Sequence, residues 1–209
     1  MRVTVLGAAG RTGRLLVARL ADGHDVRAVV RRESQLDGVA ALGGTGVLGD
    51  VEADDVSELL SGADAVVWAV GASFGDTAGH AERIRDGGIR AVAAAEASGV
   101  GRWVQISSMY ADRPDDAPPP MRASMAHKGA VDAALVRSGL AWTVVRPGGL
   151  VDDPARGLVT VGSELAQGMI TRADVTDVVA ELLATGRGEG AAFDLVQGTT
   201  PIDEAVAAL

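Results

Sequence analysis

Gly7-Ala8-Ala9-Gly10-Arg11-Thr12-Gly13 decides the fold, because it directly follows an apolar run at 3–6 and opens a helix-like stretch at 12–21. We expect the first glycine to permit a tight turn, the second to let backbone N–H groups approach a diphosphate, and the third to let the helix pack closely. The N-terminus of that helix favours negative charge, through its unpaired N–H groups and its dipole. The pattern therefore predicts a dinucleotide site, with all of these residues except Ala8 as candidate contacts.

The residues after the second predicted strand indicate which dinucleotide is bound. The strand at 25–30 is followed by Arg31 and Arg32. An NAD site usually carries an acidic residue here, which holds the ribose 2′-hydroxyl, whereas guanidinium groups suit the 2′-phosphate of NADP. Arg11 is expected to point to the same side. We therefore predict NADP(H) as the cofactor; the alternative that Arg32 is merely solvated and Arg31 binds alone stays open.

Further cofactor contacts are expected where the next strands end. Asp50 and Val51 follow the strand at 46–48, where the carboxylate would lie near the amino group of the adenine ring. The alternative is that Asp50 only caps the turn. Ala69 and Gly71 end the following apolar run and are candidates by position.

Short apolar runs alternate with amphipathic stretches along the whole chain. Strands are predicted at 3–6, 25–30, 46–48, 65–69, 103–107, 142–146 and 192–196, and helices at 12–21, 36–42, 54–60, 84–98, 124–138, 174–184 and from Thr200-Pro201 onward. Apolar strands separated by helices indicate a parallel sheet covered on both faces. We predict an α/β fold, a Rossmann-like doubly wound parallel sheet with a small C-terminal extension. Residues 1–209 would form one domain, with about 147–209 as its substrate-side part. The irregular stretches 71–80, 109–123 and 147–168 are expected at the ligand-binding edge.

The composition narrows the class of protein. The 209 residues are 47% hydrophobic with a formal net charge of −9, so the chain can bury a core. An acidic surface argues against nucleic acid or an anionic membrane as the partner and leaves a small-molecule substrate. The chain has no cysteine, which excludes thiol catalysis and suits a cytoplasmic protein. It shows no apolar run long enough to span a membrane and no spacing typical of metal ligands.

Positive charge is unevenly distributed along the chain. Residues 1–32 contain seven arginines and two aspartates, a difference of +5, which marks a candidate anion site. The alternative is an arginine-rich surface helix. Of the 19 basic residues, 18 are arginine and the other is Lys128. A lone lysine suggests a position that needs a compact ammonium group with a tunable pKa.

The order of these motifs resembles a known family. The resemblance rests on the glycine loop, the arginines after the second strand, Gly49-Asp50, Ile106-Ser107-Ser108, Lys128 and Val145-Arg146-Pro147-Gly148-Gly149-Leu150. Together they are similar to the atypical short-chain dehydrogenases/reductases, in particular the small NAD(P)H-binding group of flavin/biliverdin reductases and NmrA-like proteins. The resemblance covers essentially the whole chain. It implies a nicotinamide near Pro147, Gly148 and Gly149, with Ser107 beside the cofactor and Lys128 on its ribose.

The resemblance also implies a catalytic serine, tyrosine and lysine, with the tyrosine four residues before the lysine. Here Ser124 stands four residues before Lys128, on the same helix face, and its hydroxyl is a poor acid near neutral pH. Ser108 stands at the position of the family's serine. Tyr110, the only tyrosine, is a candidate donor from a loop, or else covers apolar surface.

Two histidines lie near the predicted site. His80 follows a glycine-rich stretch and is a candidate for the substrate cleft. His127 precedes Lys128 on the same helix, about 100° away around the axis, and is expected at the surface.

These observations predict an NADP(H)-dependent oxidoreductase that transfers hydride to an unidentified small organic acceptor, such as a carbonyl, a quinone or a flavin-like ring. A proton from solvent would make the missing tyrosine dispensable. The alternative is an NmrA-like NADP-binding redox sensor or regulatory protein without turnover. A sugar-nucleotide epimerase or dehydratase is a weaker alternative, because such enzymes keep the tyrosine and have a larger C-terminal part. The oligomeric state is not predicted.

Overall fold

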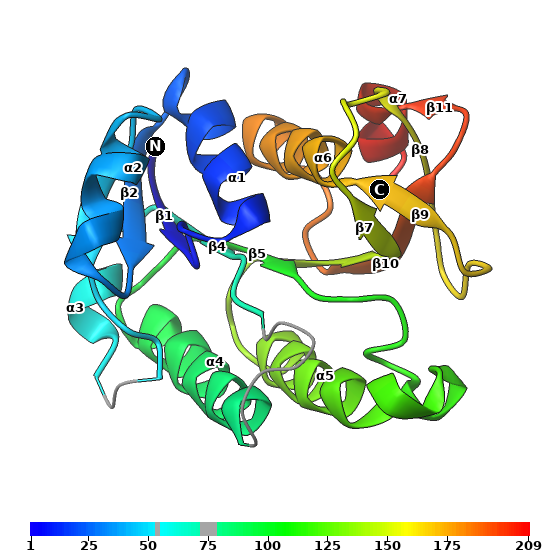
Figure 1. Cartoon of the computed structure of the whole chain (residues 1–209), viewed down its shortest axis with the longest axis horizontal. Coiled ribbons are helices and arrows are strands. Elements are labelled where there is room, and N and C mark those ends of the chain that lie inside the picture. The colour runs from blue at the N-terminus through cyan, green and yellow to red at the C-terminus, as the bar shows by residue number, and fades with distance from the viewer. Residues whose placement is uncertain (53–54, 72–78) are drawn as a thin grey trace.

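The computed structural model describes residues 1–52, 55–71 and 79–209, and in these residues a nine-stranded sheet lies between two layers of helices (Figure 1). The sheet consists of β1 (Arg2–Leu6), β2 (Asp25–Val30), β3 (Thr45–Leu48), β4 (Ala65–Trp68), β5 (Arg102–Ile106), β6 (Trp142–Pro147), β8 (Leu158–Gly162), β10 (Ala191–Gln197) and β11 (Thr200–Pro201). Its order is β11-β8-β10-β6-β5-β4-β1-β2-β3. The part running β3-β2-β1-β4-β5-β6 is parallel and has the strand order of a dinucleotide-binding Rossmann fold. The predicted fold class is confirmed.

Helices cover both faces of the sheet. One layer contains α1 (Arg11–Ala21), α2 (Leu36–Ala40), α6 (Arg172–Thr185) and α7 (Ile202–Ala207), and the other contains α3 (Ser57–Leu60), α4 (His80–Ala97) and α5 (Arg122–Val136). Short 3₁₀ turns lie at Glu33–Gln35, Pro114–Asp116 and Pro119–Met121. The described residues contain no helix that is long and apolar enough to cross a membrane.

The core explains why these segments form strands. The central strands are rich in valine, and all four residues of β4 are buried. Alternate side chains enter an apolar cluster on either face of the sheet, one with α1 and α6, the other with α4. Strands buried on both faces show continuous apolar runs, which is the pattern visible in the sequence.

Residues after β6 form more structure than expected. The stretch 147–168 was predicted to be irregular, but it contains β7 (Gly149–Val151) and β8. β7 pairs in parallel with β9 (Met169–Thr171), and β8 pairs antiparallel with β10 and β11. β8, β10 and β11 therefore extend the main sheet, whereas β7 and β9 form a separate two-stranded sheet.

Two predicted helix starts differ from the structure by three or four residues. α4 begins at His80 rather than at residue 84, because Gly79 adopts a left-handed conformation (φ 80°) directly before a polar first turn. α3 begins at Ser57, whereas the predicted start at residue 54 lies outside the described residues.

Candidate functional site

A cavity of about 670 Å³ opens at the carboxyl ends of the central strands. Its walls come from the glycine loop after β1, from the ends of β4, β5 and β6, and from α5. In a doubly wound sheet, ligands bind where the strand order reverses, which here is between β1 and β4. The fold thus places the cavity where a dinucleotide binds.

The glycine loop forms a cradle that side chains would fill. Gly7 has φ +85°, and a Cβ there would lie 2.8 Å from the carbonyl group of Ala69. A Cβ on Gly13 would overlap the carbonyl oxygen of Gly7. Gly10 forms the N-cap of α1 without a side-chain cap, and the first turn of α1 carries no acidic residue. These N–H groups and the helix dipole fit a diphosphate.

A second cavity of about 230 Å³ continues from this cradle along the ends of β2 and β3. Arg31, Gln35, Val51 and Glu52 line it. Arg32 is exposed and is not among the lining residues, so the alternative in which Arg31 acts alone fits the geometry.

Glu52 is the acidic side chain of this second cavity, and sequence reasoning missed it. Arg31 Nη1 donates to Glu52 Oε1 at 3.0 Å, and Arg83 Nε donates to Glu52 Oε2 at 2.8 Å. His80 Nδ1 lies 3.3 Å from Oε1, so His80 lines this cavity and not the larger one in which a substrate cleft was expected. Asp50 caps the turn by accepting the backbone N–H of Glu52 at 2.9 Å, and its contact with adenine stays a prediction.

The expectation that Arg11 points to the same side as Arg31 was wrong. Arg11 Nη1 donates to Asp152 Oδ2 at 3.0 Å, and the buried Arg172 donates to Asp152 Oδ1 at 2.6 Å. Both arginines line the larger cavity. Arg11 is the first residue of α1, and its side chain reaches the segment after β7.

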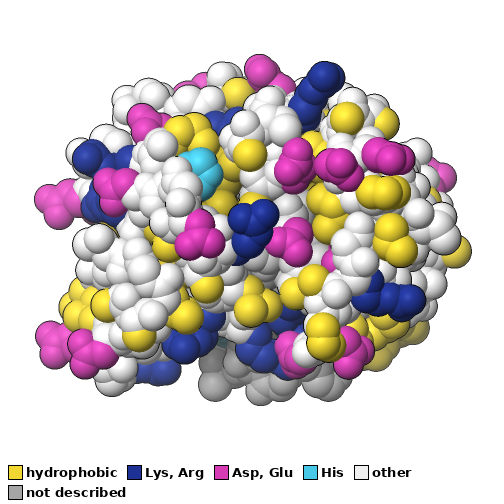
Figure 2. Space-filling view, turned by 90° about the horizontal axis from the view of Figure 1, so that it is seen from above, with side chains coloured by type: hydrophobic (Ala, Val, Ile, Leu, Met, Phe, Trp, Pro, Cys, Tyr) yellow, Lys and Arg dark blue, Asp and Glu magenta, His cyan; other side chains and the backbone are white. Residues whose placement is uncertain are grey.

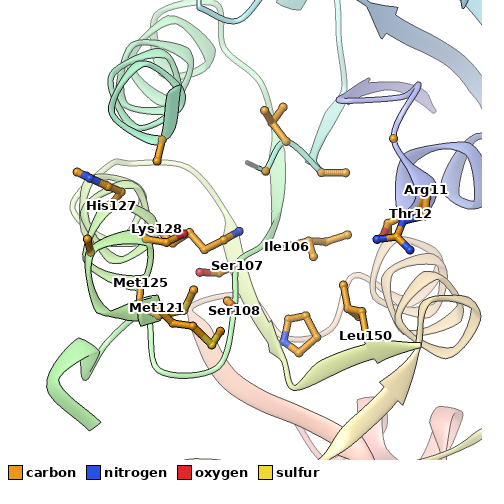
Figure 3. A pocket seen from close by; sticks show the side chains of 18 of the residues that line it. Arg11, Thr12, Ile106, Ser107, Ser108, Met121, Met125, His127, Lys128 and Leu150 are labelled. Atoms are coloured by element: carbon orange, nitrogen blue, oxygen red, sulfur yellow. The ribbon is translucent and has the colours of Figure 1, made fainter. Parts of the chain in front are cut away.

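The other end of the larger cavity brings four predicted residues together. Ser107, Ser108, Ser124 and Lys128 all line it, and the Lys128 side chain points inward (Figure 3). Lys128 Nζ lies 3.6 Å from the point where a Cβ on Gly71 would stand. Burial lowers the pKa of Lys128, and the negative charge of Asp132 raises it in part.

Tyr110 does not line this cavity. It is one of two described non-glycine residues with a left-handed backbone (φ 71°), and its ring lies under the guanidinium group of Arg113, 5.3 Å from the centroid. The suggestion of a donor from the loop is therefore not supported. His127, expected at the surface, is half-buried at the edge of the cavity, where its Nδ1 lies 3.4 Å from Arg85 Nη1.

Asp132 is the buried acid that sequence reasoning missed. Ser107 Oγ donates to Asp132 Oδ2 at 2.7 Å, and Arg146 Nε lies 3.4 Å from the same oxygen. Oδ1 is buried without a hydrogen-bond partner. Burial raises the pKa of Asp132, against the opposing effects of Ser107, Arg146 and Lys128. The available signal was its position four residues after Lys128, on one helix face.

The remaining wall of the larger cavity is largely apolar. Ile106, Met121, Met125, Pro147 and Leu150 line it. Gly148 also lines it, and a Cβ there would overlap the carbonyl oxygen of Gly168, whereas Gly149 is not among the lining residues. Thioether side chains adapt to flat or irregular ligands, so this wall suits an apolar ring.

The charge of the cavity contrasts with the charge of the whole chain. Its described lining includes Arg11, Lys128 and Arg172 against Glu82, although the chain carries −9 overall. On the outer face seen in Figure 2, acidic and basic side chains are interspersed. The lining thus carries more basic than acidic side chains, with Arg11 and Arg172 sharing the carboxylate of Asp152.

Comparison with known proteins agrees with this geometry. Residues 7–186 match the family model described as NAD(P)H-binding. The chain is 33% identical over 213 residues to the "Uncharacterized sugar epimerase YhfK" of Bacillus subtilis, covering 99% of both chains. A solved structure, "Putative NAD-dependent epimerase/dehydratase from Bacillus halodurans", superposes with a TM-score of 0.95 at 36% identity over the full length of both chains. A curated protein of Streptomyces griseus, "(4-alkanoyl-5-oxo-2,5-dihydrofuran-3-yl)methyl phosphate reductase", is 34% identical over 151 residues, which cover 69% of this chain and 46% of that protein.

Proposed function

The chain belongs to the NAD(P)H-binding family, within the atypical short-chain dehydrogenases/reductases, and from this premise we propose that it is an NADP(H)-dependent oxidoreductase. The observation that carries the proposal is one cavity in which the glycine cradle, Lys128, serine hydroxyls and an apolar wall meet. The cradle binds phosphate, and the apolar wall adjoins the serine and lysine side chains where a reacting ring would stand. When bound, the reduced cofactor supplies the hydride.

The preference for NADP(H) is supported by the second cavity. Arg31 and Gln35 stand at the end of β2, where a 2′-phosphate would be recognised. Glu52 holds Arg31 at 3.0 Å and competes with that phosphate for the guanidinium group. Arg31 is half exposed on its side chain, so it has room to turn toward the ligand.

The chain's own residues have distinct roles in this proposal. Lys128 holds the hydroxyl groups of the nicotinamide ribose, and Pro147 and Gly148 shape the wall beside the ring. Ser108 donates a hydrogen bond to the oxygen of the acceptor and orients it. Met121 and Met125 exclude water and contact the apolar part of the acceptor. A flat conjugated acceptor, such as a quinone or a flavin, or an apolar carbonyl compound suits this wall.

Two alternatives have some support. The absence of a tyrosine four residues before Lys128 favours a redox sensor that binds NADP(H) without turnover. The names of two similar proteins favour epimerase or dehydratase chemistry, but Ser124 stands where such enzymes carry the tyrosine, which argues against it.

The test is NADPH oxidation by the purified protein with FMN, menadione and a medium-chain aldehyde, each against a blank without protein. Turnover with any acceptor supports the oxidoreductase. Ser108→Ala should then lower kcat about tenfold or more, the value of one well-placed hydrogen bond, while the Kd of NADPH stays within ~2-fold. Tight NADPH binding without turnover of any acceptor would favour the sensor instead.

A further inference from the structure

The hydroxyl groups at the reacting end of the cavity are poor proton donors. Ser107 directs its hydrogen to Asp132, 2.7 Å away, and is buried. Ser108 and Ser124 are ordinary alcohols, far weaker acids than the phenol of the family pattern. Tyr110 lies outside the cavity, against Arg113. A reductase with this site needs another source for the proton.

Lys128 is suited to that role by its placement. Its Nζ projects into the cavity beside Gly71 (Figure 3), and no hydrogen bond or ion pair joins it to any described residue. Burial brings the pKa of this ammonium group below its ordinary value. An acid whose pKa approaches the working pH is an effective general acid.

Asp132 is the carboxylate whose charge acts on Lys128, from one helical turn further along α5. It is 3% exposed, with Oδ1 unpartnered and Oδ2 shared by Ser107 and by Arg146 of β6. Because Ser107 donates to Asp132, the oxygen lone pairs of Ser107 remain free on the cavity side.

Other charged groups also face this end of the cavity. From α4, Arg85 and Glu82 line the cavities around Lys128. From α5, His127 lies at the edge, with its Nδ1 3.4 Å from Arg85 Nη1, and in Figure 3 its ring points away from Ser107. Because an imidazolium group can also donate a proton, His127 is the competing candidate for the acid.

We propose that Lys128 protonates the substrate in this site, and that Asp132 is a positioning residue that keeps Lys128 charged and holds Ser107 as an acceptor facing the cavity. This inference rests on the oxidoreductase function proposed above. In the reduction of a carbonyl group by a reduced nicotinamide, hydride adds to carbon and the π electron pair moves to oxygen. One Nζ–H bond of Lys128 breaks as the new O–H bond forms. The neutral amine then regains a proton from water entering the cavity.

The sole lysine makes this inference directly measurable. Protein labelled with ¹³C-lysine gives one side-chain Cε signal, that of Lys128, whose shift reports its protonation without cofactor or substrate. We expect it to titrate below the ordinary lysine value of ~10.4. An acid must be protonated to act, so kcat/KM for menadione reduction should fall as pH rises through the same midpoint. This comparison needs only the wild-type protein.

Asp132→Asn keeps an acceptor for Ser107 but removes the charge. The midpoint of the Lys128 titration and the midpoint of the fall in kcat/KM should then both move down by ~1 pH unit, as expected for loss of a nearby opposite charge. Asp203→Asn, an exposed change on α7, is the control and should move neither. Lys128→Arg keeps a cation that does not release its proton in this range, so kcat should fall about 100-fold or more, with the Kd of NADPH within ~3-fold.

Each outcome decides the inference. Both assignments are supported if kcat/KM falls at high pH with the same midpoint as the Lys128 titration in the wild type. In Asp132→Asn, the two midpoints must also move together. Lys128 is overturned as the donor if the fall of kcat/KM at high pH has a different midpoint from the lysine titration. It is also overturned if His127→Gln abolishes that fall. A lysine midpoint unchanged in Asp132→Asn overturns the role of Asp132. Absence of turnover with every acceptor overturns the oxidoreductase proposal itself, and the proton donor with it, while the lysine titration still reports on Asp132.

Discussion

Arg31 and Arg137 are both exposed arginines, but of the two only Arg31 lines the second cavity. Arg31→Ala should raise the Kd of NADPH about tenfold or more, because a hydrogen bond to a charged group contributes ~1.5–3 kcal/mol. NADH has no 2′-phosphate, so its Kd should stay within ~2-fold. Calorimetric titration of both cofactors measures the difference, with Arg137→Ala as the charge-matched control. An equal loss of affinity for both cofactors would contradict the 2′-phosphate argument.

Lys128 also makes a prediction about stability. Its pKa is lowered by burial, so the folded chain binds fewer protons than the unfolded chain, and the free energy of unfolding rises with pH between the folded value and ~10.4. Lys128→Met removes this titration. Its Tm should therefore exceed that of the wild type at neutral pH.

The difference in Tm should shrink as pH rises through that window, because the wild-type lysine then becomes neutral in both states. Thermal unfolding of both proteins from neutral to alkaline pH measures this, with Arg137→Met as a control for the added apolar side chain. A difference that stays constant with pH would show that packing, and not the buried charge, is responsible.

Individual site residues could be predicted where they belong to a sequence motif. The glycine loop, Ser107, Ser108, Ser124 and Lys128 were placed from sequence and lie around one cavity. Asp132 and Glu52 were missed because their roles arise from burial and from partners far apart in sequence, such as Ser107, 25 residues away. The spacing of Asp132 from Lys128 was a local signal, but it carries no information about the contact with Ser107.

A substitution at the N-terminus of α1 can test cofactor binding without disrupting the fold. A Cβ on Gly10 would meet only the carbonyl oxygen of Gly7, at 3.2 Å, and the φ of −69° is open to alanine. Gly10→Ala should therefore fold, with a loss of ~1 kcal/mol or less. The methyl group would stand in the diphosphate path, so the Kd of NADPH should rise about tenfold or more.

Gly23→Ala is the matched control, because a Cβ at Gly23 meets nothing within 4 Å. It should change neither the Kd nor the Tm. Unfolding by denaturant and titration with NADPH separate the two effects. If Gly10→Ala bound NADPH as tightly as Gly23→Ala does, the cradle would not be the diphosphate site.

Helices and strands were predicted well where the hydrophobic pattern runs over a continuous stretch of the sequence. The parallel strands β1 to β6 and the helices between them follow from apolar runs and stop signals. β7, β8, β9 and β11 have two to five residues each and carry no comparable pattern. β8 pairs with the edge of β10, β11 pairs with β8, and β7 pairs with β9, so these strands form through tertiary pairing that outweighs local preference.

At the scale of the whole molecule, a chain of acids and bases joins the C-terminal strand to the cavity. It runs through Asp194, Arg113, Asp112, Arg146, Asp132 and Ser107, with each neighbouring pair of polar atoms within 3.4 Å. The sequence could not reveal it, since its members come from β10, the segment after β5, β6 and α5. Asp194 also accepts the backbone N–H of Leu165, so the C-terminal strands and the cavity floor share one polar network.

Arg113 is the link in this network whose removal should cost the most. Its Nη2 lies 2.6 Å from Asp194 Oδ2, and Asp194 is 1% exposed with Oδ1 unpartnered. Arg113→Ala leaves that buried charge without its cation, so the free energy of unfolding should fall by about 3–5 kcal/mol. Arg19→Ala is the control, because it breaks a pair with Asp177 in which the side chains are 52% and 32% exposed, worth ~1 kcal/mol or less. Urea unfolding of both variants at neutral pH measures the difference. If the two losses were equal, the buried pair would contribute no more to stability than a surface pair does.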